Sequence, residues 1–161
     1  MNDQSLEVAL EPQSMIKIER FVDTVCDQLL INDTYYGSIL MAVTEMFSIC
    51  LEKSEPNTLN IQYNTDYQIL KINFQPIDTE LINGFSQQSA ADFNFGIKEG
   101  KSIFLIKSLT DSVKILGADS IELEFDISAM HNKVYTHRLD TLNEYFSKSR
   151  KEQLTRENGQ L

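Results

Sequence analysis

Residues 34–54 read TYYGSILMAVTEMFSICLEKS, and this stretch decides the fold. Its apolar residues recur every three or four positions, which places them on one side of an amphipathic helix: Ile39, Leu40, Val43, Met46, Phe47, Cys50 and Leu51. Asp33 and Thr34 offer oxygens to cap the first turn, and Pro56 stops the helix just after Ser54. Glu45 lies on or beside the apolar stripe, so it is either an acid that reaches solvent from the edge or a functional carboxylate.

The segments on either side of this helix supply surfaces for it to pack against. A second apolar stripe predicts a helix over residues 14–31, joined to residues 34–54 by a short turn. After Pro56 the apolar period changes from 3.6 to 2, which predicts an antiparallel hairpin of strands near residues 59–64 and 69–74.

The second half of the chain repeats helix and hairpin. The apolar spacing predicts a short helix, a longer helix and two hairpin strands over residues 78–85, 100–112, 113–116 and 120–127. In the last strand Glu122, Glu124 and Asp126 share one face, which we expect to lie in water. The irregular connection within residues 75–100 is typical of a lid or binding loop. Its Phe93 and Phe95 either anchor that loop or stack on a ligand.

The chain is long enough, at 161 residues, for one domain with a sizeable core, and too short for a second full domain. We expect residues 1–13, which are polar and acidic, to be a flexible N-terminus. Residues 14–130 form the domain, and residues 131–161 an amphipathic helix with a polar tail. That helix either packs on the body or docks on another chain.

Charge and composition exclude several classes of function. Residues 1–130 hold 8 basic and 20 acidic side chains, and such an acidic body disfavours nucleic acid, whose phosphates require clustered Lys and Arg. No apolar run approaches the roughly 20 residues that span a bilayer, and no secretory signal is present, so we expect a cytoplasmic protein without membrane contact. Two cysteines and two histidines do not make a zinc site, and no metal site is expected.

The segment Ala42-Val-Thr-Glu-Met-Phe-Ser-Ile-Cys50 resembles the N box of the GHKL (histidine-kinase-like) ATPases. It is most similar to that of the anti-sigma-factor serine kinases of the RsbW and SpoIIAB kind, whose pattern is A-V-x-E-x-x-x-N. The resemblance implies that Glu45 matches the acid that acts near the attacking nucleophile. The magnesium-binding Asn of the family is Ile49 here, and isoleucine offers no oxygen to a hard cation. Glu45 is therefore a vestigial catalytic residue on this reading.

Two further motifs of the family are altered. Its D-x-G-x-G turn, which contacts adenine, corresponds to Asn73-Phe-Gln-Pro-Ile-Asp78, where no glycines follow Asp78 and Pro76 removes a backbone donor. Its glycine-rich phosphate segment corresponds to Gly100-Lys-Ser-Ile-Phe-Leu-Ile106, where Ser102 replaces the second glycine. The candidate nucleotide-binding residues are Asp78, Gly100, Lys101 and Ser102, although Asp78 can instead cap the short helix.

The resemblance implies the α+β two-layer sandwich of this fold. Its sheet is mixed but mostly antiparallel, with about four to five strands, three helices on one face and here an added C-terminal helix. It favours a degenerate regulator that binds a protein partner, such as a sigma factor or a STAS-type antagonist, with weak or no ATP binding. One alternative is an active ATP- and magnesium-dependent serine kinase whose site is rebuilt from Asn73, Asp78, Lys101 and Ser102. The other is a self-associating module, and a homodimer is compatible with each of the three.

Overall fold

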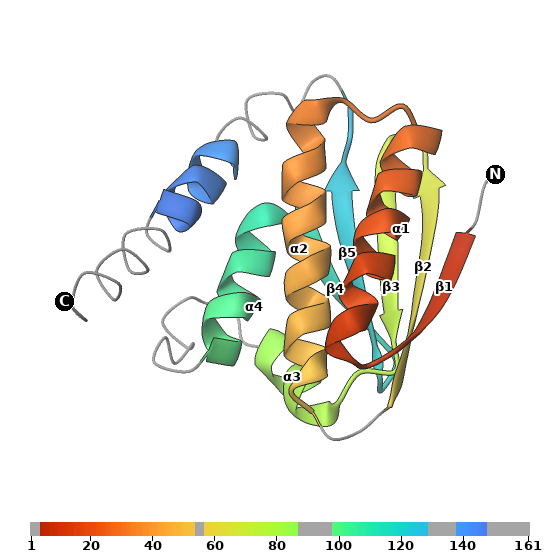
Figure 1. Cartoon of the computed structure of the whole chain (residues 1–161), viewed down its shortest axis with the longest axis vertical. Helices are drawn as coiled ribbons and strands as arrows, with labels where there is room; N and C mark the ends of the chain where they lie inside the picture. The colour runs from red at the N-terminus through yellow and green to blue at the C-terminus, as the bar shows by residue number, and fades with distance from the viewer. Residues whose placement is uncertain (1–3, 54–56, 87–97, 129–137, 148–161) are drawn as a thin grey trace.

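The computed structural model describes residues 4–53, 57–86, 98–128 and 138–147. Within these residues the fold is a five-stranded antiparallel sheet covered on one face by helices, which is the predicted α+β sandwich (Figure 1). Phe93 and Phe95 lie outside the described residues. The sheet has the strand order β1-β2-β3-β5-β4. Its strands are β1 (Gln4–Ala9), β2 (Thr58–Asp66), β3 (Ile69–Gln75), β4 (Ser112–Leu116) and β5 (Ser120–Asp126).

The predicted helices are all present, with small shifts in their ends. A 3₁₀ turn, η1 (Pro12–Ser14), leads into the helices α1 (Met15–Gln28), α2 (Asp33–Leu51), α3 (Thr79–Phe85) and α4 (Lys98–Leu109), and residues 138–147 form a further helix. The cap of α2 comes from Asn32, whose side chain accepts a hydrogen bond from the Thr34 amide, rather than from Asp33 or Thr34. Asp78 caps α3 by accepting from the amide of Glu80.

The expectation that residues 1–13 are flexible is wrong for residues 4–9, which form the edge strand β1. Leu6 pairs with Ile61 and Val8 with Leu59, so both side chains point toward the helices, and Val8 is buried. Only two apolar residues alternate in this stretch, too few to predict a strand from the sequence. The strand forms because β2 offers it a hydrogen-bonding edge.

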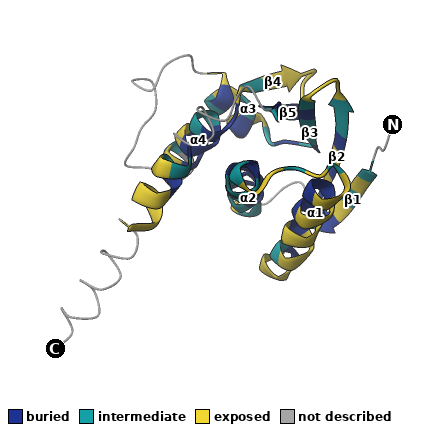
Figure 2. Ribbon diagram, turned by 90° about the horizontal axis from the view of Figure 1, so that it is seen from above, coloured by how far each residue is buried: buried dark blue, intermediate teal, exposed yellow. Residues whose placement is uncertain are grey.

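The hydrophobic core fills the space between the inner face of the sheet and the helices. Leu59, Ile61 and Tyr63 alternate inward along β2, and the apolar faces of α1 and α2 pack over them. The Tyr63 ring meets Phe21 of α1 edge to face, and its hydroxyl donates to Gln28 at 2.7 Å. The exposed residues of α1 lie on the side of the helix that faces away from the sheet (Figure 2). The buried residues of α1 and α2 are therefore mostly those of the apolar stripes predicted from the sequence.

The outer face of β5 departs from its prediction. Glu122, Glu124 and Asp126 are not fully in water, and Glu124 is only 8% exposed. Neighbouring strands flank β5 on both sides, and Lys114 of β4 places its Nζ 3.1 Å from the Glu124 Oε2. Burial raises the pKa of Glu122, the carboxylate of Glu124 raises it further, and Lys71 and Lys114 offset part of the effect.

Among the described residues, α2 is the one helix long and apolar enough, by length and composition, to cross a membrane. The expectation that no apolar run reaches this length is therefore wrong. Half of the most apolar window of α2 is buried inside the protein, against the sheet and the neighbouring helices. A core helix of a globular domain needs the same apolar length because it is covered on several sides.

Shortening Val8 to alanine tests whether β1 belongs to the folded core. We expect Val8→Ala to lower the free energy of unfolding by about 2 kcal/mol, because a buried side chain loses two carbon atoms. Urea unfolding measures the change, with Ser5→Ala on the exposed face of β1 as the matched control. Equal stability of the two variants would mean that β1 is not docked.

The raised pKa of Glu122 predicts a pH-dependent effect of removing its charge. Because ionisation of Glu122 costs more in the folded than in the unfolded chain, this group lowers stability as the pH rises through its folded pKa. We expect Glu122→Gln to raise Tm at pH 7.5 and to lose this advantage toward pH 4. Thermal unfolding at both pH values measures it, with Glu7→Gln as the control for the change in net charge. The same gain at both pH values would contradict the shift.

Candidate functional site

Glu45 and Ser102 meet where α2 lies beside α4. The Ser102 hydroxyl donates a hydrogen bond of 2.8 Å to the Glu45 Oε2. Ser102 is buried and Glu45 is half-buried, so this bond is largely shielded from water. The helices are neighbours along this contact (Figure 1). The Ser102 hydroxyl therefore takes one of the acceptor positions of the Glu45 carboxylate.

A small cavity adjoins this pair. It measures about 150 Å³ and is lined by Glu45, Ser48, Lys101, Ser102, Leu105 and Tyr145. Sites for drug-sized ligands usually measure about 300–1,000 Å³. The cavity bounded by these side chains is therefore below that range.

Ile49 does not reach the cavity. It lies one residue beyond Ser48 on α2, and its side chain is 1% exposed within the hydrophobic core. Glu45 and Ser48, three residues apart, instead present the polar side of the helix to the cavity. The side chain at position 49 is therefore hydrocarbon packed among apolar neighbours, and it offers no oxygen to a cation.

Three of the five predicted site residues come together, and two do not. Glu45, Lys101 and Ser102 line the cavity. Asp78 caps α3, and its charge helps to raise the pKa of Cys50 after the larger effect of burial. Gly100 lies inside α4 rather than before it and does not line the cavity.

Asn73, proposed for a rebuilt kinase site, is engaged elsewhere. Its side-chain amide donates to the Ser120 hydroxyl at 2.7 Å, and it pairs with Glu122 on the neighbouring strand. Two of the four residues of the rebuilt site, Asn73 and Asp78, therefore do not line the cavity beside Glu45. The described residues also contain no cluster of three or more His, Cys, Asp or Glu side chains placed to hold a metal ion.

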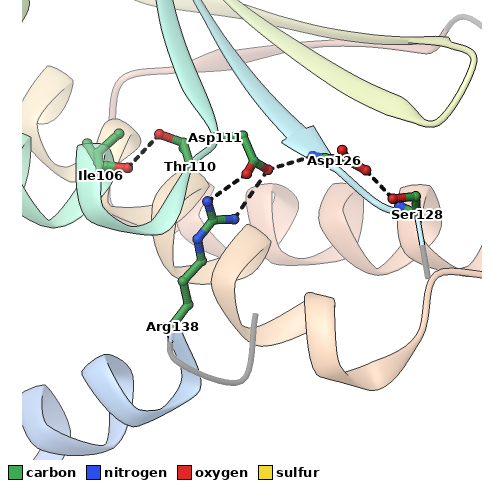
Figure 3. Close-up of polar contacts among 6 residues, drawn as sticks. All are labelled: Ile106, Thr110, Asp111, Asp126, Ser128 and Arg138. Carbon is green, nitrogen blue, oxygen red and sulfur yellow. Dashed lines mark hydrogen bonds and ion pairs between the residues drawn. The ribbon is translucent and has the colours of Figure 1, made fainter. Parts of the chain in front are cut away.

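Tyr145 reaches the cavity from the helix of residues 138–147, which sequence reasoning left without a role at the site. Arg138 starts this helix and is 6% exposed. Its guanidinium donates to both carboxylate oxygens of Asp111, at 2.8 and 3.3 Å (Figure 3). Paired contacts of this kind fix orientation as well as distance. The sequence does show an arginine at the start of an amphipathic segment and an acid before β4. The apolar period of one sequence does not reveal that these two distant residues form an ion pair.

Asp111 connects this helix to the end of the sheet. Its Oδ2 also accepts from the Asp126 amide at 2.6 Å, and the Asp126 carboxylate accepts from the Ser128 amide (Figure 3). The Tyr35 hydroxyl at the start of α2 donates to the Ser128 carbonyl. One chain of polar contacts therefore links α2, β5 and residues 138–147.

A larger cavity of about 450 Å³ lies at the junction of α1 and α2. Its lining is acidic and apolar: Asp23, Cys26, Asp27, Leu30, Ile31, Asp33 and Tyr36. The Tyr36 hydroxyl donates to Asp23, which with burial raises the pKa of Tyr36 to about 12. None of the described residues that line this cavity is basic and three are acidic, so the lining disfavours phosphate groups.

Comparison with solved structures supports the fold. The chain is similar to the crystal structure of the RsbU and RsbW domains of Rv1364c from Mycobacterium tuberculosis, with a TM-score of 0.56 and 9% sequence identity. The similarity covers 79% of this chain and 32% of that chain, so this chain spans about a third of that protein. No model of a protein family and no curated protein matches the sequence. At this identity the similarity shows the fold alone, and it is the fold that the N-box resemblance predicted.

Replacing Ile49 with the asparagine of the family tests how firmly this position belongs to the core. We expect Ile49→Asn to lower the free energy of unfolding by about 2–5 kcal/mol, because an amide would be buried among apolar side chains. Ile49→Val is the matched control and should cost about 1 kcal/mol. Urea unfolding of both variants measures the difference. If Ile49→Asn were as stable as Ile49→Val, the side chain would have access to a polar site.

Proposed function

We propose that this protein is a degenerate anti-sigma-type regulator, which binds a protein partner and binds ATP weakly or not at all. One observation carries the proposal: the hydrogen bond between Ser102 and Glu45, which closes the remaining catalytic position of the fold. The hydrocarbon side chain of Ile49, buried next to it, gives the same position no ligand for magnesium.

Electrostatics support weak nucleotide binding. Phosphoryl transfer requires metal-assisted neutralisation of phosphate charge and in-line positioning of the nucleophile. Among the described residues that line the small cavity, Lys101 is the one basic side chain, and Glu45 shares that lining. One cation beside one carboxylate does not neutralise a triphosphate. The acidic cavity between α1 and α2 adds repulsion rather than a second cradle.

The partner follows from the fold by analogy. The similar solved structure contains a domain named RsbW, and the family that this chain resembles acts on sigma factors and their antagonists. A sigma factor or a STAS-type antagonist is therefore the proposed partner, and a homodimer is compatible with it. Fold alone does not fix function, so this assignment needs a direct binding experiment.

Calorimetry with Mg-ATP tests the nucleotide half of the proposal. We expect no binding heat at micromolar ATP for the full chain, and none for Ser102→Gly, because freeing Glu45 does not replace the missing magnesium ligand. Labelled phosphate should not be transferred to any candidate antagonist. Micromolar affinity of the unmodified chain would contradict the proposal, and phosphate transfer that Glu45→Gln abolishes would establish an active kinase.

Binding to candidate partners tests the other half. We expect one sigma factor or STAS-type antagonist from the same genome to bind with the same Kd with and without Mg-ATP, because the nucleotide contributes nothing to the bound surface. Surface plasmon resonance with the purified candidates measures this. An affinity that appears only with ATP would contradict the proposal.

A further inference from the structure

A surface on α2 and α4, which we call the docking face, lies beneath the helix of residues 138–147. It consists of Gly37 and Glu45 of α2 and Lys101 and Leu105 of α4. Gly37 contacts the leucines of that helix, and the other three residues line the cavity that Tyr145 also lines. The same face therefore carries the altered catalytic position and a bound helix.

The fit at Gly37 is close. A Cβ atom at this position would lie 3.4 Å from Leu142 Cδ1 and 3.6 Å from Leu139 Cδ2, which is ordinary van der Waals contact. An alanine therefore fits beneath the two leucines, and a larger side chain does not. Leu142 is 5% exposed, so it is the apolar anchor of the helix.

The helix sits outside the two layers of the domain. Apart from Leu142, every buried apolar residue of the described core lies between Val8 and Phe125. Half of Phe146 and 41% of Tyr145 are exposed, and the two rings meet edge to face. An isolated helix of this length is not stable in water, so its contacts with the docking face maintain it. A segment with so few buried apolar contacts opens at a lower free energy than the core.

From this arrangement we infer that the docking face receives an amphipathic helix of the protein partner, in exchange for residues 138–147, which act as a built-in competitor. This rests on the proposed function in that the partner is a protein. The bound helix shows what fits: leucines at positions i and i+3, an aromatic residue at i+6 and an arginine at i−1, as in Arg138, Leu139, Leu142 and Tyr145. Asp111, which accepts from Arg138, favours a helix with a basic residue at that same position.

A thiol probe in the cavity reports release of the helix. Ser48 lines the cavity, and the native Cys26 and Cys50 are buried with pKa values raised to about 12, so they react slowly. Residues 138–147 are released by Arg138→Ala, Leu139→Ala and Leu142→Ala together, which we call the released variant. Asp111 still accepts from the Asp126 amide there. We expect at least tenfold faster labelling of Ser48→Cys in the released variant.

Gln62→Cys on the exposed face of β2 is the matched control, and its labelling rate should not change. Circular dichroism confirms that the released variant keeps its fold. An unchanged labelling rate at Ser48→Cys would overturn the inference, because the helix would not cover the face. So would a rise that accompanies loss of the whole secondary structure, because the helix would then be part of the core.

A synthetic peptide of residues 134–151 tests the docking face directly. We expect the peptide to bind the released variant at least tenfold more tightly than the unmodified chain, measured by fluorescence anisotropy. Adding Gly37→Leu, which fills the space under the two leucines, should abolish binding, whereas Gly37→Ala should not. Peptide binding that survives Gly37→Leu, or no binding to the released variant, would overturn the inference.

Light scattering tests whether the docking face instead binds a second copy of this chain. If the released variant forms dimers that the peptide dissociates, the face receives a second copy of this chain, and the proposal of a partner helix is wrong. The peptide and thiol experiments use neither ATP nor a sigma factor. Their failure would leave the proposed function to be judged by calorimetry and by partner binding, so the two proposals fail separately.

Discussion

The structure depends on the packing of α2, which is covered by the sheet on one side and by α4 and residues 138–147 on others. So much of its surface is buried that few side chains remain for chemistry. Glu45 and Ser48 are the ones that reach the small cavity. The same packing explains why position 49 is an isoleucine. A side chain there is surrounded by core residues, so a hydrocarbon is stable in that place and a polar metal ligand is not.

The polar network around Asp111 has a different role from the core. It joins the start of residues 138–147 to the end of β5, and Ser128 joins it to Tyr35 of α2. The ion pair is nearly buried on the arginine side, where removing one partner costs more than the pair itself contributes. Charge therefore positions the C-terminal helix, and two leucines hold it on α2. The altered catalytic position is covered as a result.

Much of the fold could be predicted from the sequence, because the helices and hairpins have long, regular apolar periods. The strand of residues 4–9 could not, since Leu6 and Val8 alone carry its pattern and its stability comes from pairing with β2. At the site, the absence of an oxygen ligand at Ile49 was visible in the sequence. The bond between Ser102 and Glu45 was not, because it joins residues 57 positions apart. The period of the apolar residues predicts which face of a helix or strand is buried. It does not predict which side chain from a distant part of the chain contacts that face.

The central claim is that serine and isoleucine have closed an ancestral nucleotide position, leaving a surface for protein. A crystal structure of the full chain grown with magnesium and a non-hydrolysable ATP analogue at millimolar concentration tests this most directly. The account predicts that the Ser102 hydroxyl still donates to Glu45 and that no nucleotide is ordered in the cavity. Adenine and phosphates ordered beside Glu45, with a metal ion between them, would contradict it.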